Sequence, residues 1–529
     1  MKYRFAASIA MAAMLVAAPA GVTAQVPADQ LVIGLSMSNV LTLDPAEAVG
    51  TEAFDILTNI YDRLVEMQPD DPSTVVPGLA ESWVVDENGS ITFTLRRDAV
   101  FQSGNPVTAR DAAWSLERVM ALNLGPASLL RELGYTAENM ADKLTVADDF
   151  TLTLDLADPV SPETILYTLA RTVGNVVDAE TVGSHEADGD WGRAWLTNNS
   201  AGSGPFSLSR WSANDVVILD RVDGYWRGDA ELRRVVLRHI PESQTQRLLI
   251  ESGDIDVART LSTTDLQVLG TRDDIEIHKV ASGGFYYLAV STKDGPFAEP
   301  GVRAALPWLI DYEGIQASVI GDYGTVRQVP VPDTYPGAIA DPGYELDVER
   351  AKAILAEAGY PDGFDAEIRV LAEAPFNDIA TAVQASLAQA GIRAEILQGN
   401  GTQVYGRMTD RDFSMVVGRS GAQMPNVLGA IQAYTSNIDN GPDGPTNSLA
   451  WRTSWDIPEL TELTAAAREE LDDDRRIALY EEIQELLIAS DPPLLAIAAA
   501  TQPAAVRASV NGLIEQQSRS PHFFFVNKD

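Results

Sequence analysis

A strand–helix–strand pattern in the second half of the chain limits the fold more than any other feature. Residues 368–370 alternate apolar and polar side chains as a strand does, and residues 379–387 repeat apolar side chains at helical spacing before Gly391. Residues 392–396 alternate again. Strand, helix and strand in this order predict two parallel strands joined by a right-handed crossover. The chain is therefore expected to be an α/β protein.

The sequence on both sides of this unit extends the same interpretation. Asp347 is placed to cap a helix whose apolar positions 351, 354, 355 and 358 share one face, and Gly359 closes that helix. A further strand is predicted at 413–417, so the loop 418–426 leaves the carboxyl end of a strand. In open α/β sheets, ligands bind at that edge.

The region 59–198 is predicted to be a separate unit that is rich in strands. Asn88-Gly89 is a hairpin signal, and residues 91–95 and 152–156 alternate apolar with polar side chains. Near the other end of the chain, two helices are predicted at 460–467 and 477–487, and Pro492 ends the second.

The first 24 residues have the composition of an export signal. Lys2 and Arg4 precede an apolar run from Phe5 to Ala20, and cleavage is expected near Ala24. An uncleaved membrane anchor is the alternative. The chain contains no Cys, which excludes disulfides and a lipidated N-terminal Cys. We therefore expect an exported, unlipidated protein of the periplasm.

Charge and motif content argue against several classes of function. The chain has 38 Lys and Arg against 76 Asp and Glu, a net charge of −38, which disfavours nucleic acids and anionic membranes as partners. Residues 418–422 fail the GxSxG pattern at the last position, and the four His lack metal-ligand spacing. No catalytic residue, metal ligand or cofactor is predicted. A secreted hydrolase on a similar α/β scaffold is the alternative function.

Five blocks of sequence, in order along the chain, follow one family pattern. Residues 59–65 read NIYDRLV where that pattern has NIYEGLV, and residues 77–83 read PGLAESW against P.LAESW. The five blocks are residues 43–45 with 59–65, 77–83, 93–96 with 101–111, 204–206 with 224–228 and 252–256, and 296–297 with 302–311. Together they resemble family 5 of the solute-binding proteins of ABC transporters, the group of dipeptide, oligopeptide and nickel receptors.

The resemblance implies a two-lobe periplasmic binding protein-like fold of type II with an extra β-containing subdomain. Lobe I would comprise residues 26–58, 199–284 and 498–529, the subdomain residues 59–198, and lobe II residues 285–497. The first 24 residues would be the signal peptide.

The function implied is that of a periplasmic substrate-binding protein of an ABC importer. Its lobes would close on a peptide-like or other small polar solute, anionic solutes included, and deliver it to the permease in the inner membrane. The solute could be a peptide, an opine, a sugar conjugate or a small acid, and a monomer is expected. A metal-chelate receptor, as in the nickel branch, is a further alternative.

Two segments are expected to face the cleft between the lobes. Strand alternation sends Tyr286 and Tyr287 to opposite faces, so one ring would contact ligand while the other packs in the core. In the loop 418–426, the candidates are Arg419, Ser420 and Gln423. Donors near three further residues would complete the site: Asn39, Ser203 and Gly204.

The loop 418–426 departs from the pattern of the peptide receptors, which is like Gly-Trp-x-x-Asp, with the carboxylate binding a peptide's α-ammonium. Arg419 stands at the Trp position and Ala422 at the Asp position. Burying an ammonium without its partner costs about 3–5 kcal/mol, or two to three decades of affinity. Unless another carboxylate takes over, this position is unsuited to a peptide N-terminus. Arg419 would either bind an acidic group of the ligand or form a structural ion pair.

Overall fold

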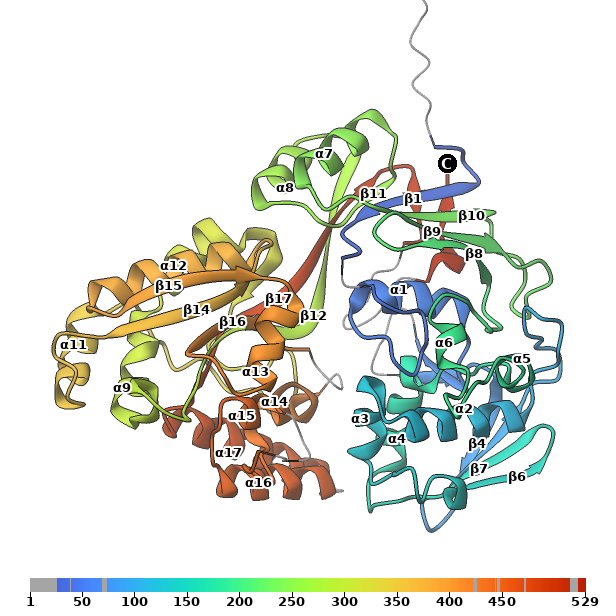
Figure 1. Ribbon diagram of the computed structural model, residues 1–529, viewed down its shortest axis with the longest axis horizontal. Helices are drawn as coiled ribbons and strands as arrows, with labels where there is room; N and C mark the ends of the chain where they lie inside the picture. The colour runs from blue at the N-terminus through green and yellow to red at the C-terminus, as the bar shows by residue number, and fades with distance from the viewer. Residues whose placement is uncertain are drawn as a thin grey trace, which may run out of the picture.

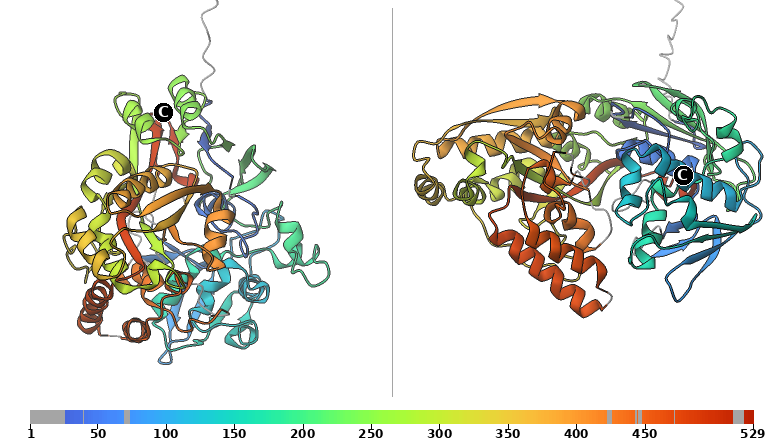
Figure 2. Two further views of the ribbon diagram at one scale, coloured as in Figure 1. Left: turned by 60° about the vertical axis from the view of Figure 1, so that its left-hand side comes forward. Right: turned by 60° about the horizontal axis from the view of Figure 1, so that its bottom comes forward.

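Two long antiparallel strands, β12 (Ile275–Val290) and β17 (Leu494–Arg507), join two halves of the molecule that lie on either side of them (Figure 1). The computed structural model describes residues 26–38, 40–68, 74–421, 426–442, 444, 448–470, 472–513 and 522–529. The view turned about the horizontal axis shows the same two halves side by side (Figure 2, right). The predicted export signal, residues 1–24, lies outside the described residues. Within the described residues, no helix is long and apolar enough to cross a membrane.

One sheet of eleven strands runs through both halves. From edge to edge its strands are β15 (Arg393–Gly399), β14 (Asp365–Leu371), β16 (Met415–Arg419), β12, β17, β11 (Val257–Ala258), β1 (Gln30–Leu35), β10 (Arg234–His239), β9 (Val216–Arg221) and β8 (Phe206–Ser212), with β13 (Gly324–Val326) paired to β17 off this path. We call the half with β14–β16 the β14 half and the other the β1 half. The predicted lobe boundaries at 284/285 and 497/498 fall inside β12 and β17, and the division into lobes stays a prediction.

The strand–helix–strand unit of the β14 half is confirmed. β14 and β15 are parallel, with Ile368 opposite Ile396, and the crossover contains α12 (Phe376–Gln389). β16 is parallel to β14 on its other side. The preceding helix, α11 (Val348–Glu357), begins where predicted, because the Asp347 side chain accepts a hydrogen bond from the amide of Arg350. The predicted C-terminal helices are α16 (Pro458–Glu469) and α17 (Asp473–Ala489), which pack near α14 (Val427–Thr435).

The β-rich unit predicted early in the chain is also present. An antiparallel sheet of four strands has the order β4 (Ala80–Val85), β5 (Ile91–Leu95), β7 (Thr151–Leu154) and β6 (Leu144–Asp148). The hairpin between β4 and β5 turns at Gly89, whose positive φ of 86° favours glycine. α2 (Ala109–Leu122) begins with a capping box of Thr108 and Asp111. This unit lies in the β1 half, together with α1 (Thr51–Ile60) and α3 (Ser128–Arg131) (Figure 1).

Two buried polar contacts tie this unit to the rest of the β1 half. Arg118 of α2 donates two hydrogen bonds to the carboxylate of Asp44, at 2.7 and 2.6 Å, and both side chains are at most 1% exposed. The carboxylate of Asp62 accepts hydrogen bonds from the Tyr225 hydroxyl at 2.7 Å, the Ser203 hydroxyl at 3.0 Å and Trp226 Nε1 at 3.1 Å. Two of the sequence blocks that carry the family resemblance, residues 59–65 and 224–228, thus meet at the buried Asp62.

Candidate functional site

The carboxyl end of β16 lies where the two halves meet. Arg419, the last residue of β16, is opposite Tyr286 of β12 in the sheet. The N-terminal end of α1 comes to this place from the β1 half: the Thr51 hydroxyl accepts a hydrogen bond from Gln502 of β17 at 3.4 Å, and the carboxylate of Glu52 attracts Arg419. The loop after β14 contributes Glu373, which is also near Arg419 and Glu52. The predicted binding edge of the sheet therefore faces α1.

The electrostatics of this junction keep Arg419 charged. Burial opposes its charge, but Tyr286, Tyr405 and Glu52 raise the pKa of Arg419 overall. Burial raises the pKa of the Glu373 carboxyl, repulsion from Glu52 adds to the rise, and Arg419 opposes it. Burial likewise raises the pKa of Tyr286, whose hydroxyl therefore stays protonated at neutral pH.

Arg419 forms no ion pair within the part of the chain that the structure describes, since no carboxylate oxygen there is within 4.0 Å of its nitrogens. The Tyr286 ring is 0% exposed and packs edge-on against Phe376 at 5.5 Å. Its hydroxyl lies near the Arg419 guanidinium, but no hydrogen bond of normal geometry satisfies it. Of the predicted residues that the structure describes, Arg419 is the one with a charged side chain at the junction, and the Tyr286 hydroxyl beside it is buried without a partner.

Ser420 and Tyr287 are engaged in the scaffold. The Ser420 hydroxyl accepts hydrogen bonds from the Phe285 amide at 3.0 Å and from the Tyr434 hydroxyl at 2.9 Å. Tyr287 is 1% exposed, and its hydroxyl donates to Sδ of Met408 at 3.7 Å. The two Ser420 bonds tie the residue that follows β16 to β12 and α14, and the Tyr287 bond ties β12 to Met408.

Ser203 and Gly204 also have structural partners. Ser203 is 2% exposed and donates its hydroxyl hydrogen to Asp62, while the Gly204 amide donates to the Ile60 carbonyl at 2.9 Å. A Cβ at Gly204 would come within 2.7 Å of the carbonyl carbon of Ile60, so the close approach requires glycine. Asn39 and Gln423 lie outside the described residues, as does Ala422.

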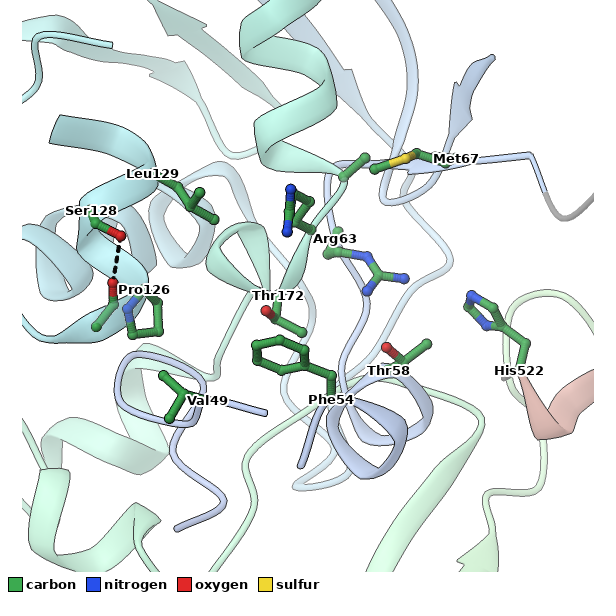
Figure 3. Close-up of a pocket in the computed structure, with 13 residues that line it drawn as sticks. Val49, Phe54, Thr58, Arg63, Met67, Pro126, Ser128, Leu129, Thr172 and His522 are labelled. Atoms are coloured by element: carbon green, nitrogen blue, oxygen red, sulfur yellow. Dashed lines mark hydrogen bonds between the residues drawn. The ribbon is translucent and has the colours of Figure 1, made fainter. Parts of the chain in front are cut away.

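A cavity of about 260 Å³ opens in the wall of the β1 half, between α1, α3 and the segment 170–172 (Figure 3). Its apolar lining includes Val49, Phe54, Met67 and Leu129. Three side chains that can carry positive charge also line it: Arg63, Arg171 and His522. Such a mixture of apolar walls and a few polar groups is typical of small-molecule sites.

The cavity lies close to the contact between the halves. Arg171 attracts the carboxylate of Glu132, which follows α3. Glu132 in turn touches the β14 half, because its carboxylate accepts a hydrogen bond from Gln432 of α14 at 3.2 Å and its carbonyl accepts one from Arg468 of α16 at 3.4 Å. Figure 1 shows α1 and α3 on the side of the β1 half that faces the β14 half.

Sequence reasoning did not select the cavity residues. One signal for Arg63 was present, because this chain has Asp62-Arg63-Leu64 where the family pattern has Glu-Gly-Leu. A glycine replaced by the longest cationic side chain is a departure of the same kind as Arg419 in place of Trp. Glu52 and Glu373 carried no such signal among 76 acidic residues.

Two α/β halves joined by two long strands, with a polar site at their junction, define the class of the two-lobe periplasmic binding proteins. Residues 74–442 match the family described as "Bacterial extracellular solute-binding proteins, family 5 Middle". The chain belongs to this family and is a solute-binding protein.

Individual relatives agree with this assignment. The chain is 27% identical over 471 residues to the probable D,D-dipeptide-binding periplasmic protein DdpA of Escherichia coli K12, covering 88% of this chain and 87% of DdpA. The fold is similar to that of DppA from Helicobacter pylori in complex with the peptide STSA, with a TM-score of 0.83, 23% identity, and coverage of 94% of this chain and 98% of DppA. It is also similar to that of AgaA from A. tumefacien R10 in complex with agropinic acid, with a TM-score of 0.78, 24% identity, and coverage of 94% of this chain and 99% of AgaA.

Proposed function

We propose that the protein is the periplasmic receptor of an ABC importer and that it binds a small acidic solute between its two halves. The observation that carries the proposal is Arg419, a charged side chain at the junction of the halves that has no acidic partner within 4.0 Å in the described part of the chain. A guanidinium in this setting forks onto a carboxylate, phosphate or sulfonate, and such charge-assisted bonds are among the strongest in proteins.

The mechanism is binding by closure, with no covalent step. The solute would contact Arg419 on the β14 half and the face of α1 on the β1 half. Since it touches both walls only when they approach, its binding energy favours the closed arrangement. The closed receptor would then dock, as a monomer, on its permease in the inner membrane.

The solutes of similar proteins support this range. DdpA is described as binding D,D-dipeptides, and the AgaA structure contains agropinic acid. The chain shares the fold of both a peptide receptor and an acid receptor, and its own Arg419 favours recognition of an acidic group over that of an ammonium. A peptide would be accepted through its carboxylate, with its ammonium held elsewhere.

The test begins with mass spectrometry of any solute that purifies with the protein, followed by thermal-shift assays with peptides, opines, sugar conjugates and small organic acids. Acidic compounds are expected to raise the melting temperature. At a ligand concentration of a hundred times Kd, the free energy of unfolding should rise by about 2.7 kcal/mol. Arg419→Met is expected to weaken their binding about 10- to 100-fold, the value of one charged hydrogen bond.

Arg393→Met is the matched control, because Arg393 lies in the same half with its side chain 60% exposed. Its binding should equal that of the wild type. Small-angle scattering with and without the best ligand would measure closure. The proposal fails if no acidic solute stabilises the protein, or if Arg419→Met binds as tightly as Arg393→Met.

A further inference from the structure

One buried arginine differs from all others in the described residues. Four arginines there are buried, Arg118, Arg303, Arg327 and Arg63, with exposed fractions of 1%, 6%, 8% and 5%. The first three each donate three hydrogen bonds, to carbonyl or carboxylate oxygens. The Arg63 side chain donates none to any described residue, and its Nε is fully buried without a partner.

A guanidinium nitrogen that is buried without an acceptor is unfavourable, because it has lost its hydrogen bond to water without gaining another. Native proteins rarely keep such a group unless a ligand or ordered water satisfies it. The Arg63 side chain lines the 260 Å³ cavity described above, and Figure 3 shows its guanidinium extending into that space, in the direction of His522. Its donors are thus directed at a place that a small molecule can occupy.

The nearby acids do not take up this charge. Glu66 attracts Arg63 electrostatically, but a carboxylate oxygen of Glu66 accepts a hydrogen bond from Nη2 of Arg227 at 2.8 Å. Two further side chains of basic residue types, Arg171 and His522, also line the cavity. Arg63 is the lining cation whose Nε has no partner among the described residues.

The cavity walls limit the rest of the ligand. Phe54, Met67 and Leu129 present apolar surface, while the hydroxyl-bearing Thr58 and Thr172 lie beside them (Figure 3). A charged group with no carbon body would leave these apolar walls in contact with water. A group attached to an aliphatic or aromatic part would cover them and gain the free energy of burial.

We propose that this cavity is an anion-binding site in which the Arg63 guanidinium binds the carboxylate of an apolar organic acid. The inference rests on the proposed function and deepens it, because it identifies an acid with an adjoining apolar part as the solute class. The planar fork of Arg63 matches the two oxygens of a carboxylate. The cavity belongs to the half of the molecule that does not contain Arg419.

The first experiment needs no ligand. Arg63→Met keeps the side-chain volume and removes the unpaired charge, so the melting temperature of the empty protein should rise by about 2–4 °C. Arg118→Met is the matched control, since Arg118 is equally buried but paired with Asp44, and its melting temperature should fall. A fall for Arg63→Met, or failure of this variant to fold, would show that Arg63 is structural and would overturn the inference.

The second experiment uses sodium benzoate and benzamide as probes, which share a ring and differ in the carboxylate. Benzoate should raise the melting temperature of the wild type and benzamide should not. Arg63→Met should lose the benzoate shift, and Arg63→Lys, which keeps the charge but not the fork, should retain only part of it. No benzoate shift in the wild type, or an equal shift in Arg63→Met, contradicts the inference.

The two proposals can fail separately. An acidic solute that binds Arg63→Met as well as the wild type, but not Arg419→Met, would refute the role of Arg63 and leave the proposed function standing. Failure of every acid to bind the wild type would overturn the proposed function itself.

Discussion

The buried ion pair between Asp44 and Arg118 should be strongly coupled, and this can be measured. Both Nη atoms of Arg118 bond the two oxygens of Asp44 at 2.7 and 2.6 Å, with 1% and 0% exposure of the side chains. Asp44→Asn would leave the cation of Arg118 buried with a neutral acceptor. Arg118→Met would leave the carboxylate of Asp44 buried with the amide of Ala46 as its remaining donor.

The magnitude follows from the desolvation of each orphaned charge. Removing one partner of a buried pair costs about 3–5 kcal/mol. A chain of this length has an unfolding entropy of about 1 kcal/mol per degree, from about 2.1 cal/mol/K per residue, so each single variant should melt about 3–5 °C lower. The double variant Asp44→Asn/Arg118→Met buries no charge and keeps an acceptor for the Ala46 amide. Its loss should therefore be smaller than the sum of the single losses, by at least about 2 °C.

Differential scanning calorimetry at one scan rate would give the four melting temperatures. Asp29→Asn is the control, because Asp29 pairs with Arg233 on the surface, where the side chains are 48% and 53% exposed, and no change is expected. If the losses of the single variants simply add up in the double variant, the pair is not the source of the stability and the reasoning is wrong.

Two further predictions concern other buried contacts. Burial, with repulsion from Glu66, raises the pKa of Asp62 to about 6, above its usual value of 3.8. Between about pH 4 and 6, the folded protein therefore holds a proton on Asp62 that the unfolded chain has lost. As the pH rises through that range, this group lowers the free energy of unfolding by about 3 kcal/mol. Asp62→Asn should remove this part of the pH dependence in melting curves, and an unchanged slope would contradict the assignment. Gly418→Ala places a Cβ 2.5 Å from the Tyr287 hydroxyl oxygen and should destabilise the protein by about 1–3 kcal/mol. The control Gly421→Ala, whose Cβ would have no described atom within 4 Å, should not destabilise it. Equal melting temperatures of the two variants would show that the Tyr287 ring can move aside.

The α/β fold was predictable because its signals are local. Asp347 caps α11 by accepting a hydrogen bond from the amide of Arg350, and the apolar residues between 379 and 387 all lie within α12. The parallel pairing of β14 and β15 then follows from the order strand, helix, strand. Each of these features depends on residues that lie within about 50 positions of one another, so the sequence pattern alone predicts them.

The site was only partly predictable because its partners are distant in sequence. The hydroxyl of Ser203 is taken up by Asp62, 141 residues away, and the amide of Phe285 bonds Ser420 across 135 residues. Nothing local distinguishes a serine that is satisfied in this way from one that is free to bind solute. Arg419 was recognisable because the family pattern has another residue at that position, and the same comparison would have selected Arg63.

An arginine without an acidic partner is unexpected in this chain, because it has 76 acidic residues and only 38 Lys and Arg. Arg63 and Arg419 nevertheless have no acidic partner within 4.0 Å among the described residues, and they lie on opposite halves of the molecule. If both proposals hold, each half of the receptor offers one arginine to an acidic solute. An acid that contacts both arginines gains its full binding energy only in the closed arrangement, so closure depends on the solute.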